Sequence, residues 1–133
     1  MTVGLAATAY ANKVLDHMHR AQASTAPAAN YLSLHTGDPG ASGASNLVSS
    51  STRALVTFAA ASAGAIASNN TPTWSNWAWA SPSTISHFGN FDASTSGTFL
   101  NSFALTASKV VQTGDTLTCA SGAITVSLAP IAA

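Results

Sequence analysis

Apolar residues recur at helical spacing in the first segment of the chain, over residues 2–22. Within it, Ala9, Val14 and Met18 continue a pattern of apolar positions at steps of three to five residues, as on one side of an α-helix. We therefore predict one helix over residues 2–22. Tyr10, Val14 and Met18 follow one another at four-residue steps and form a narrow stripe along one side of that helix. Such a stripe needs a cover, so we expect these three residues to bind a partner or a neighbouring subunit.

After an Ala- and Pro-containing connector at residues 23–29, the apolar pattern changes to a period of two, which is typical of β-strands. The clearest alternation lies near the C-terminus, where Ile124, Val126 and Leu128 alternate with small or polar residues. We interpret residues 117–128 as a hairpin. Further strands are predicted at 31–35, 53–59, 64–69, 73–79, 84–91 and 98–105.

Polar and turn-forming residues separate these predicted strands. The segment 92–97 (DASTSG) predicts a turn, and the Ser-, Gly- and Asn-rich residues 41–52 predict a long exposed loop. The alanine-rich segment 59–67 contains Gly64 and precedes a Ser-Asn-Asn run, so we interpret it as a strand pair around a turn.

Many short strands at spacings of about 8 to 15 residues favour a mainly β fold. We predict an antiparallel β-sandwich or flattened barrel with one N-terminal α-helix outside it. A chain of 133 residues buries one hydrophobic core of useful size, so we expect a single domain. Its parts are an N-terminal helix at 1–22, a connector at 23–29 and a β-sandwich at 30–133.

Charged residues make up only 6 % of the chain, four basic and four acidic, with a net charge of zero. Binding to phosphates needs clustered Lys and Arg, so we predict neither nucleic acid nor a membrane surface as a partner. No stretch approaches the roughly 20 apolar residues of a membrane-spanning helix. A surface with so few charges gives little electrostatic protection against association, so we expect the chain to work within an assembly.

Candidate catalytic and metal-binding residues are few. Cys119 is the only cysteine, which excludes an intrachain disulfide and a thiolate zinc site. His17 and His19 lie two apart on the predicted helix, so they point to different faces and cannot hold one metal together. We interpret His35 and Asp38 as bracing the turn that they flank. With no glutamate, no Gly-x-Ser-x-Gly elbow and no phosphate loop, we predict no enzymatic activity, no metal and no cofactor. A hydrolase with an unrecognised site remains an alternative.

Trp74, Trp77 and Trp79 form the most suggestive aromatic cluster. An exposed trio of indole rings would make a platform for sugar rings, which favours a carbohydrate-binding module. A chain poor in large apolar side chains also uses tryptophan as a core or interface anchor, and this interpretation is the simpler one. We keep all three tryptophans as candidate partner-binding residues.

Eight short segments in one order along the chain carry a family resemblance. They are LDHMHR (15–20), YLSLHTGDPG (31–40), RALVTFAAAS (53–62), ISHFGNFDA (85–93), GTFL (97–100), LTASK (105–109), GDTL (114–117) and GAITVSL (122–128). Together they span most of the chain, which resembles a family of small structural proteins of tailed bacteriophages, often labelled tail fibre-like. Capsid decoration proteins of actinobacterial phages are similar to this family. Asn90 and Asn101 are polar where the family pattern leads us to expect apolar residues.

The resemblance implies a β-rich virion component that has no enzymatic activity and works in many copies. We expect a capsid decoration protein that binds the major capsid protein lattice on the outer face of the assembled shell, as a homotrimer, and stabilises it. Its expected location is the virion, on the capsid exterior. A phage tail or tail-fibre component and a carbohydrate-binding adhesin module remain the alternatives.

Overall fold

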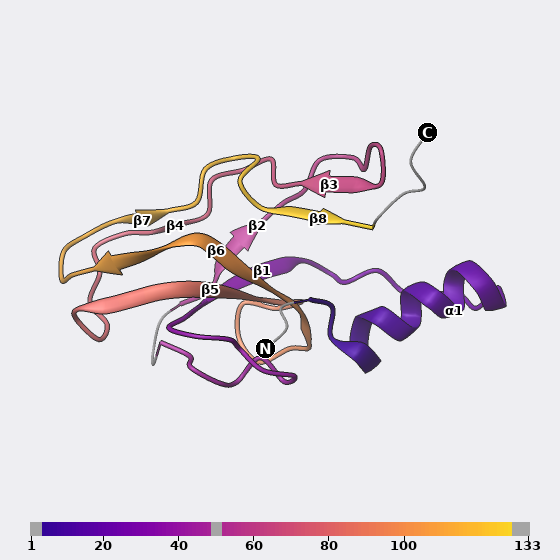
Figure 1. Cartoon of the computed structure of the whole chain (residues 1–133), viewed down its shortest axis with the longest axis horizontal. Helices are drawn as coiled ribbons and strands as arrows, with labels where there is room; N and C mark the ends of the chain where they lie inside the picture. The colour runs from indigo at the N-terminus through magenta and orange to yellow at the C-terminus, as the bar shows by residue number, and fades with distance from the viewer. Residues whose placement is uncertain (1–3, 49–51, 129–133) are drawn as a thin grey trace.

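The computed structural model describes residues 4–48 and 52–128 (Figure 1). The remaining residues, 1–3, 49–51 and 129–133, belong to the predicted helix, the predicted loop and the predicted β-domain, and they lie outside the described part of the chain. The elements are a π-helix η1 (Ala7–Ala11), an α-helix α1 (Asn12–Arg20) and strands β1 (Asn30–His35), β2 (Ala54–Val56), β3 (Ala65–Ala67), β4 (Thr73–Trp74), β5 (Ser83–Phe91), β6 (Phe99–Val111), β7 (Leu117–Thr118) and β8 (Thr125–Ser127).

The strands form two layers. One is a four-stranded antiparallel sheet in the order β2-β1-β5-β6, and the other consists of the antiparallel pairs β3–β8 and β4–β7. Figure 1 shows these two pairs running along one side of the four-stranded sheet. The sheets do not close into a barrel within the described residues. The predicted mainly β, antiparallel, sandwich-like fold with one N-terminal helix is therefore confirmed.

The hydrophobic core lies between the layers, where both contribute fully buried side chains. Leu32 and Leu34 of β1 are 0 % exposed and share one face of the sheet, because residues two apart in a strand point the same way. From the other layer, Trp74 stacks on Phe88 of β5 with ring centroids 5.7 Å apart and planes 12° apart. This aromatic contact joins the two layers at the centre of the core.

The predicted C-terminal hairpin over residues 117–128 is wrong. Strand β7 pairs with β4, and β8 pairs with β3, so neither of the two pairs with the other. Between them, Cys119 N donates to Pro72 O at 3.0 Å and Gly122 N donates to Ser68 O at 2.7 Å. These bonds keep residues 119–122 alongside residues 68–72, which connect β3 to β4. The chain therefore continues from β7 to β8 along the same neighbouring segment and does not turn back on itself at residues 120–123.

The predicted helix over residues 2–22 is longer than the observed helical segment, which begins at Ala7 and ends at Arg20. Residues 4–6 are extended and lie along β6, where Ala6 N donates to Leu100 O at 2.7 Å and Ser102 N donates to Gly4 O at 3.0 Å. The free backbone groups at the edge of β6 supply hydrogen bonds that compete with helix formation. The helix ends at Arg20, and Ala21 takes the left-handed conformation that commonly follows a helix end.

The predicted turns agree with the structure. Residues 92–97 connect β5 to β6, and Asp92 closes this turn by accepting a hydrogen bond from Thr98 N at 2.6 Å. The segment 59–67 folds back on itself, with Ala59 N donating to Ala67 O at 2.9 Å. This is the predicted strand pair around Gly64.

Strand β6 is longer than the predicted strand 98–105, because it continues through an irregularity. Ile85 of β5 pairs with Lys109, whereas His87, two residues later, pairs with Ala104. The additional residues on the β6 side interrupt the alternation of buried and exposed positions, which explains why the pattern alone ended the strand early.

Candidate interaction surface

Helix α1 extends away from the two layers at one end of the molecule (Figure 1). None of residues 4–22 is buried, and the apolar side chains of Leu15 and Met18 are 58 % and 69 % exposed. A nine-residue helix is marginal in water by itself, because most helical stability in proteins comes from packing of an apolar side. The apolar side of α1 is therefore available for a contact that residues 4–48 and 52–128 do not make.

Interactions within the helix neutralise and fix its outer end. Arg20 and Asp16 form an ion pair at 3.0 Å, one helical turn apart. Beyond the last turn, Gln22 N donates to Asp16 O at 3.3 Å, and His17 Nδ1 lies 3.1 Å from Gln22 O. These bonds hold the chain where it turns back from the helix toward β1.

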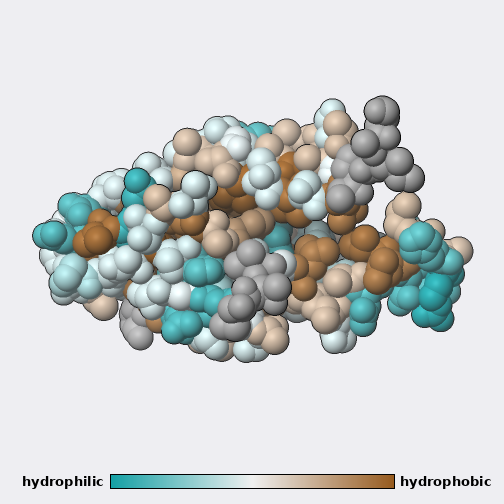
Figure 2. Space-filling view, viewed as in Figure 1, coloured by the Kyte–Doolittle hydropathy of each residue, from teal (hydrophilic) through white to brown (hydrophobic). Residues whose placement is uncertain are grey.

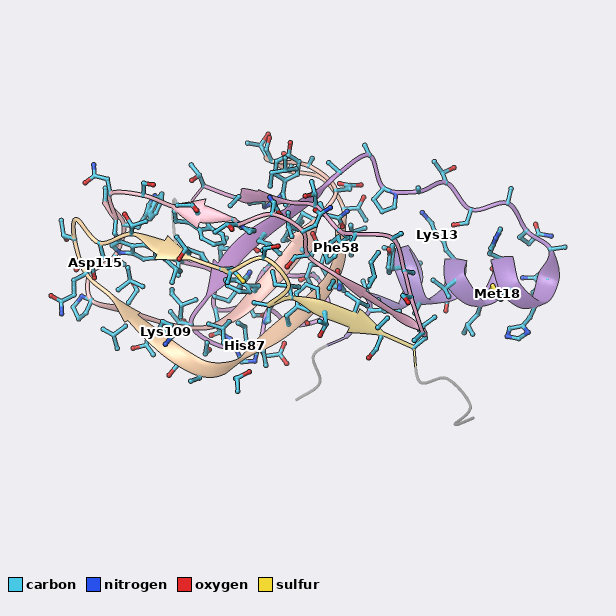
Figure 3. The ribbon with its side chains drawn as sticks, turned by 90° about the horizontal axis from the view of Figure 1, so that it is seen from above. Lys13, Met18, Phe58, His87, Lys109 and Asp115 are labelled. Atoms are coloured by element: carbon cyan, nitrogen blue, oxygen red, sulfur yellow. The ribbon has the colours of Figure 1, made fainter. Side chains whose placement is uncertain are left out.

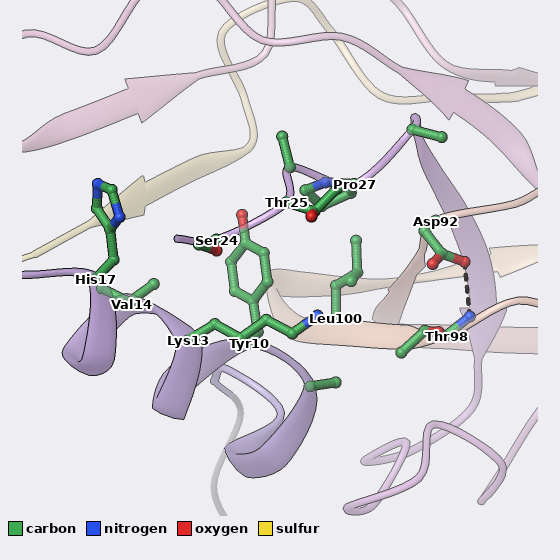
Figure 4. Close-up of a pocket in the computed structure, with 13 residues that line it drawn as sticks. Tyr10, Lys13, Val14, His17, Ser24, Thr25, Pro27, Asp92, Thr98 and Leu100 are labelled. Carbon is green, nitrogen blue, oxygen red and sulfur yellow. Dashed lines mark hydrogen bonds between the residues drawn. The ribbon is translucent and has the colours of Figure 1, made fainter. Parts of the chain in front are cut away.

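A groove of about 440 Å³ lies between α1 and the returning connector, and we call it the helix groove. Figure 4 shows Tyr10 pointing from the helical segment toward the connector, with Lys13 and His17 on the same side of the helix. Asp92, at the turn between β5 and β6, also lines this groove. The helix groove is defined by Ala9, Tyr10, Lys13, Val14, His17, Ser24, Thr25, Ala26, Pro27, Ala28, Asp92, Thr98 and Leu100.

A second groove, of about 420 Å³, lies beside the first and shares Tyr10 and Ala28 with it. We call it the apolar groove, because Leu55, Phe58 and other hydrophobic side chains form much of its walls and no charged residue of the described chain lines it. Figure 2 shows hydrophobic residues gathered where α1 meets the two layers. The apolar groove is defined by Tyr10, Ala28, Ala29, Asn30, Leu55, Val56, Thr57, Phe58, Ile66, Asn90, Asn101 and Val126.

Three asparagines on neighbouring strands form a polar row within the lining of this groove. Asn90 on β5 donates from Nδ2 to Asn30 Oδ1 on β1 and to Asn101 Oδ1 on β6, each at 2.8 Å. Asn90 is 2 % exposed and Asn101 is 4 % exposed. The Oδ1 atom of Asn90 has no hydrogen-bond partner among the described residues. The two asparagines that depart from the family's apolar pattern therefore satisfy each other in part and leave one buried acceptor unpaired.

The structure brings the predicted helix residues to this surface. Tyr10 lines both grooves, Val14 lines the helix groove, and Met18 lies exposed farther along α1. The residues that the sequence did not single out are Leu15 on the helix and Leu55 in the wall of the apolar groove. Both are apolar and about half or more exposed, but nothing in a single sequence distinguishes them from apolar residues of the core.

The structure places the three tryptophans away from this surface. Trp74 is 2 % exposed and Trp77 is 0 % exposed, while Trp79 is half-buried and packs edge-on against Trp77 with ring centroids 4.9 Å apart. The indole of Trp77 donates to Ala80 O at 3.0 Å. Two of the three rings are thus core anchors, and an exposed trio of indoles is not formed.

The buried polar residues of β1 brace a loop. His35 is 0 % exposed, with Nε2 2.8 Å from Ser33 Oγ and Nδ1 2.8 Å from Ser45 O. Burial lowers the pKa of His35, and the nearby His87 and Arg53 lower it further. Asp38 accepts a hydrogen bond from Gly40 N at 2.6 Å, so its carboxylate holds the turn and does not orient the imidazole.

Other chemistry is limited in the described residues. No group of three or more His, Cys, Asp or Glu side chains lies close enough there to hold a metal ion. Cys119 is half-buried, and burial raises the pKa of its thiol, which favours the unreactive protonated form. No described helix combines the length and the apolar character that crossing a membrane requires.

Comparison with known proteins agrees with the family resemblance seen in the sequence. Curated protein sequences give no match. A protein-family match covers residues 5–127, which includes α1, both layers and all the residues that line the two grooves. The match covers most of the 133 residues and implies a structural protein of the phage virion. The chain belongs to the family described as "Podophage GP4 fiber I protein gp80".

Proposed function

We propose that this virion structural protein is a capsid decoration protein, which binds the outer face of the assembled shell as a homotrimer and stabilises it. The observation that carries the proposal is the separation between a compact β-core and an interaction surface at one end. In this arrangement the β-core folds around Trp74 and Trp77, and α1 is free to make contacts between copies.

The stabilising mechanism follows from binding equilibria. A ligand that binds the assembled lattice and not its separated subunits raises the free energy of taking the lattice apart. The major capsid protein lattice offers many equivalent sites, and an oligomer that holds several of them at once gains avidity without new kinds of contact. Self-association through the α1 end would supply that avidity.

We propose that this role needs no enzymatic activity, cofactor or metal ion. In one Ser–His pair of the described chain, Ser33 and His35 are 1 % and 0 % exposed and bond to each other. His35 also bonds to the loop carbonyl group of Ser45, and Ser33 donates to the carbonyl group of Gly89 on β5. A buried pair of this kind braces the fold and has no access to a substrate.

A tail or tail-fibre component is the second candidate. It is favoured by the family description, which names a fibre protein. The adhesin alternative had its basis in an exposed tryptophan platform, and the burial of Trp74 and Trp77 removes that basis. Both virion candidates use the same interaction surface and differ in where the protein lies.

Imaging of labelled protein on intact particles tests the proposal. An antibody against the β-core, or a peptide tag after the C-terminus, should mark the whole surface of the head in particles viewed by electron microscopy. A control protein with Val110→Asp, a change at an exposed position of β6 far from α1, should give the same labelling. Label confined to the tail would overturn the capsid role and establish the fibre candidate.

A further inference from the structure

The apolar side of α1 is not covered by the described part of the chain. Leu15 and Met18 are three residues apart, so they lie on neighbouring positions of one helix side. Both are more than half exposed, and the charges between and beyond them neutralise each other in the Asp16–Arg20 pair. The outer half of α1 therefore presents an apolar, electrically neutral side to solvent.

The apolar groove has the complementary character. It is concave, its walls come from Leu55, Phe58 and Ile66, and no charged residue of the described chain lines it. Leu55 is 45 % exposed in the free chain. A groove without charged residues disfavours nucleic acid and charged peptides, which lose hydration there without gaining a partner charge, and its hydrophobic walls accept a neutral apolar helix side.

The chain's own helix cannot fill its own groove. Tyr10, at the start of the helical segment, lines the groove, and the helix leads away from that point. At about 1.5 Å per residue, Met18 lies about 12 Å farther along the axis. Figure 3 shows Met18 on the outer part of α1, well separated from Phe58. The two complementary surfaces thus belong to one chain but cannot meet within it.

We propose that α1 of one copy docks into the apolar groove of a second copy, with Leu15 and Met18 packed against Leu55, Phe58 and Ile66. The inference rests on the proposed homo-oligomer and names the contact that would form it. One helix and one groove per copy allow the contact to close as a ring, in which every helix and every groove is used. The near absence of surface charge leaves little repulsion between copies.

The asparagine row gives this contact a polar component. All three asparagines of the row line the groove. Asn90 and Asn101 are almost fully buried, so the partly buried Asn30 is the member of the row that a docked chain can reach. A polar group within an apolar contact also fixes the register in which the helix lies.

Disulfide trapping between singly substituted proteins tests the contact directly. In a Cys119→Ser background, protein with Met18→Cys is mixed with protein carrying Leu55→Cys under mild oxidation, without phage particles. The expected result is a cross-linked dimer that contains one copy of each variant. The matched control replaces Leu55→Cys by Val110→Cys, a position that is more exposed (61 % against 45 %) and lies next to the last residue of β6. That end of β6 is far from α1 (Figure 1). Equal cross-linking to both positions, or cross-links between Met18→Cys copies alone, would overturn the proposal.

Complementation between two defective variants provides a second measurement. The double variant Leu15→Asp, Met18→Asp places charges on the helix side of the contact, and Leu55→Asp places a charge in the groove. Each variant should raise the dissociation constant of self-association about tenfold or more. A mixture of the two should recover hetero-oligomers in native mass spectrometry, because it retains one intact helix and one intact groove. Far-ultraviolet circular dichroism checks that each variant is folded.

The outcomes separate this inference from the proposed function. Wild-type protein that stays monomeric at about 100 µM, or that binds a glycan in the groove as a monomer, overturns the helix exchange. A monomeric result would also remove the homotrimer from the proposed function, whereas head labelling and shell stabilisation are measured on particles and test the capsid role separately. Loss of the particle effects with helix exchange intact would instead overturn the capsid role alone.

Discussion

The imidazole of His35 and the carbonyl oxygen of Ser45 join strand β1 to the loop that follows it, with Nδ1 2.8 Å from the oxygen. A carbonyl oxygen only accepts, so Nδ1 carries the proton and donates it in this bond. The other ring nitrogen lies 2.8 Å from Ser33 Oγ. The ring is therefore held in one orientation and is fully buried.

This arrangement predicts a pH dependence of stability. The folded protein lowers the pKa of His35 below its usual 6.5, chiefly through burial, so the unfolded chain binds more protons in mildly acidic solution. The free energy of unfolding should be at its full value above about pH 6.5 and fall as the pH decreases toward the pKa of the folded state. Urea unfolding at pH 7.5 and pH 5 measures the difference.

Substitutions identify the group responsible. His35→Gln should lower stability at pH 7.5 but reduce the difference between the two pH values. His19→Gln, an exposed change on α1, should leave the pH difference as in the wild type. If His35→Gln keeps the full pH difference, another group causes it.

The different burial of Trp77 and Trp79 predicts that their replacement by alanine lowers stability by different amounts. Trp77→Ala removes a fully buried ring and should lower the free energy of unfolding by about 3–5 kcal/mol. Trp79→Ala removes a half-buried ring that packs edge-on against Trp77 and should lower it by about 1–2 kcal/mol. Denaturant midpoints followed by circular dichroism measure both. Equal losses would contradict the placement of Trp77 at the centre of the core.

The asparagine row predicts non-additive effects. Asn90→Leu alone leaves the Oδ1 atoms of Asn30 and Asn101 without their donor and should be destabilising by about 1–3 kcal/mol. Adding Asn101→Leu removes one of these unpaired acceptors, so the double variant should be more stable than the sum of the single losses predicts. A double-mutant cycle in urea measures the coupling, expected at about 0.5–3 kcal/mol. Strict additivity would show that the hydrogen bond between the two side chains does not form in solution.

The elements that the sequence predicted correctly are those whose shape depends on residues close together in the sequence. The turn at 92–97 closes through the side chain of Asp92, which lies within the turn itself. The partner of β8 is β3, about sixty residues earlier, and the alternation of Ile124, Val126 and Leu128 predicts a strand without predicting that partner. The C-terminal hairpin was wrong for this reason.

The interaction surface consists of the apolar side of the helix and the apolar groove, and only the helix side was predictable from the sequence. The stripe of Tyr10, Val14 and Met18 belongs to one helical segment, so its spacing shows in the sequence. The walls of the apolar groove come from separate segments, with Phe58 just after β2, Ile66 on β3 and others elsewhere. Only the fold brings them together, and their apolar character alone suggests core positions.

Removal of the N-terminal segment should leave a folded β-core. None of residues 4–22 is buried, and the deletion of residues 1–22 removes the two backbone hydrogen bonds between residues 4–6 and β6, for a loss of about 2 kcal/mol. Circular dichroism and urea unfolding of the deletion variant measure this. The same variant should lose self-association and bind phage particles much more weakly. An unfolded variant would show that the segment belongs to the core.

The proposed role on the shell predicts a mechanical effect on whole particles. If the protein binds the assembled lattice, particles made without it should come apart at a lower temperature, because the lattice loses the binding free energy that opposes disassembly. Adding purified protein back should restore the wild-type disassembly temperature, measured by release of DNA to a fluorescent dye. Restoration should be complete in the presence of a chelator, since the proposed contact uses apolar packing and hydrogen bonds and no metal ion. The deletion variant without residues 1–22 serves as the control, which should restore little, because a monomer lacks the avidity of the oligomer. If particles without the protein resist heat as well as complete ones, the stabilising role is wrong, and a function on the fibre becomes the one to test.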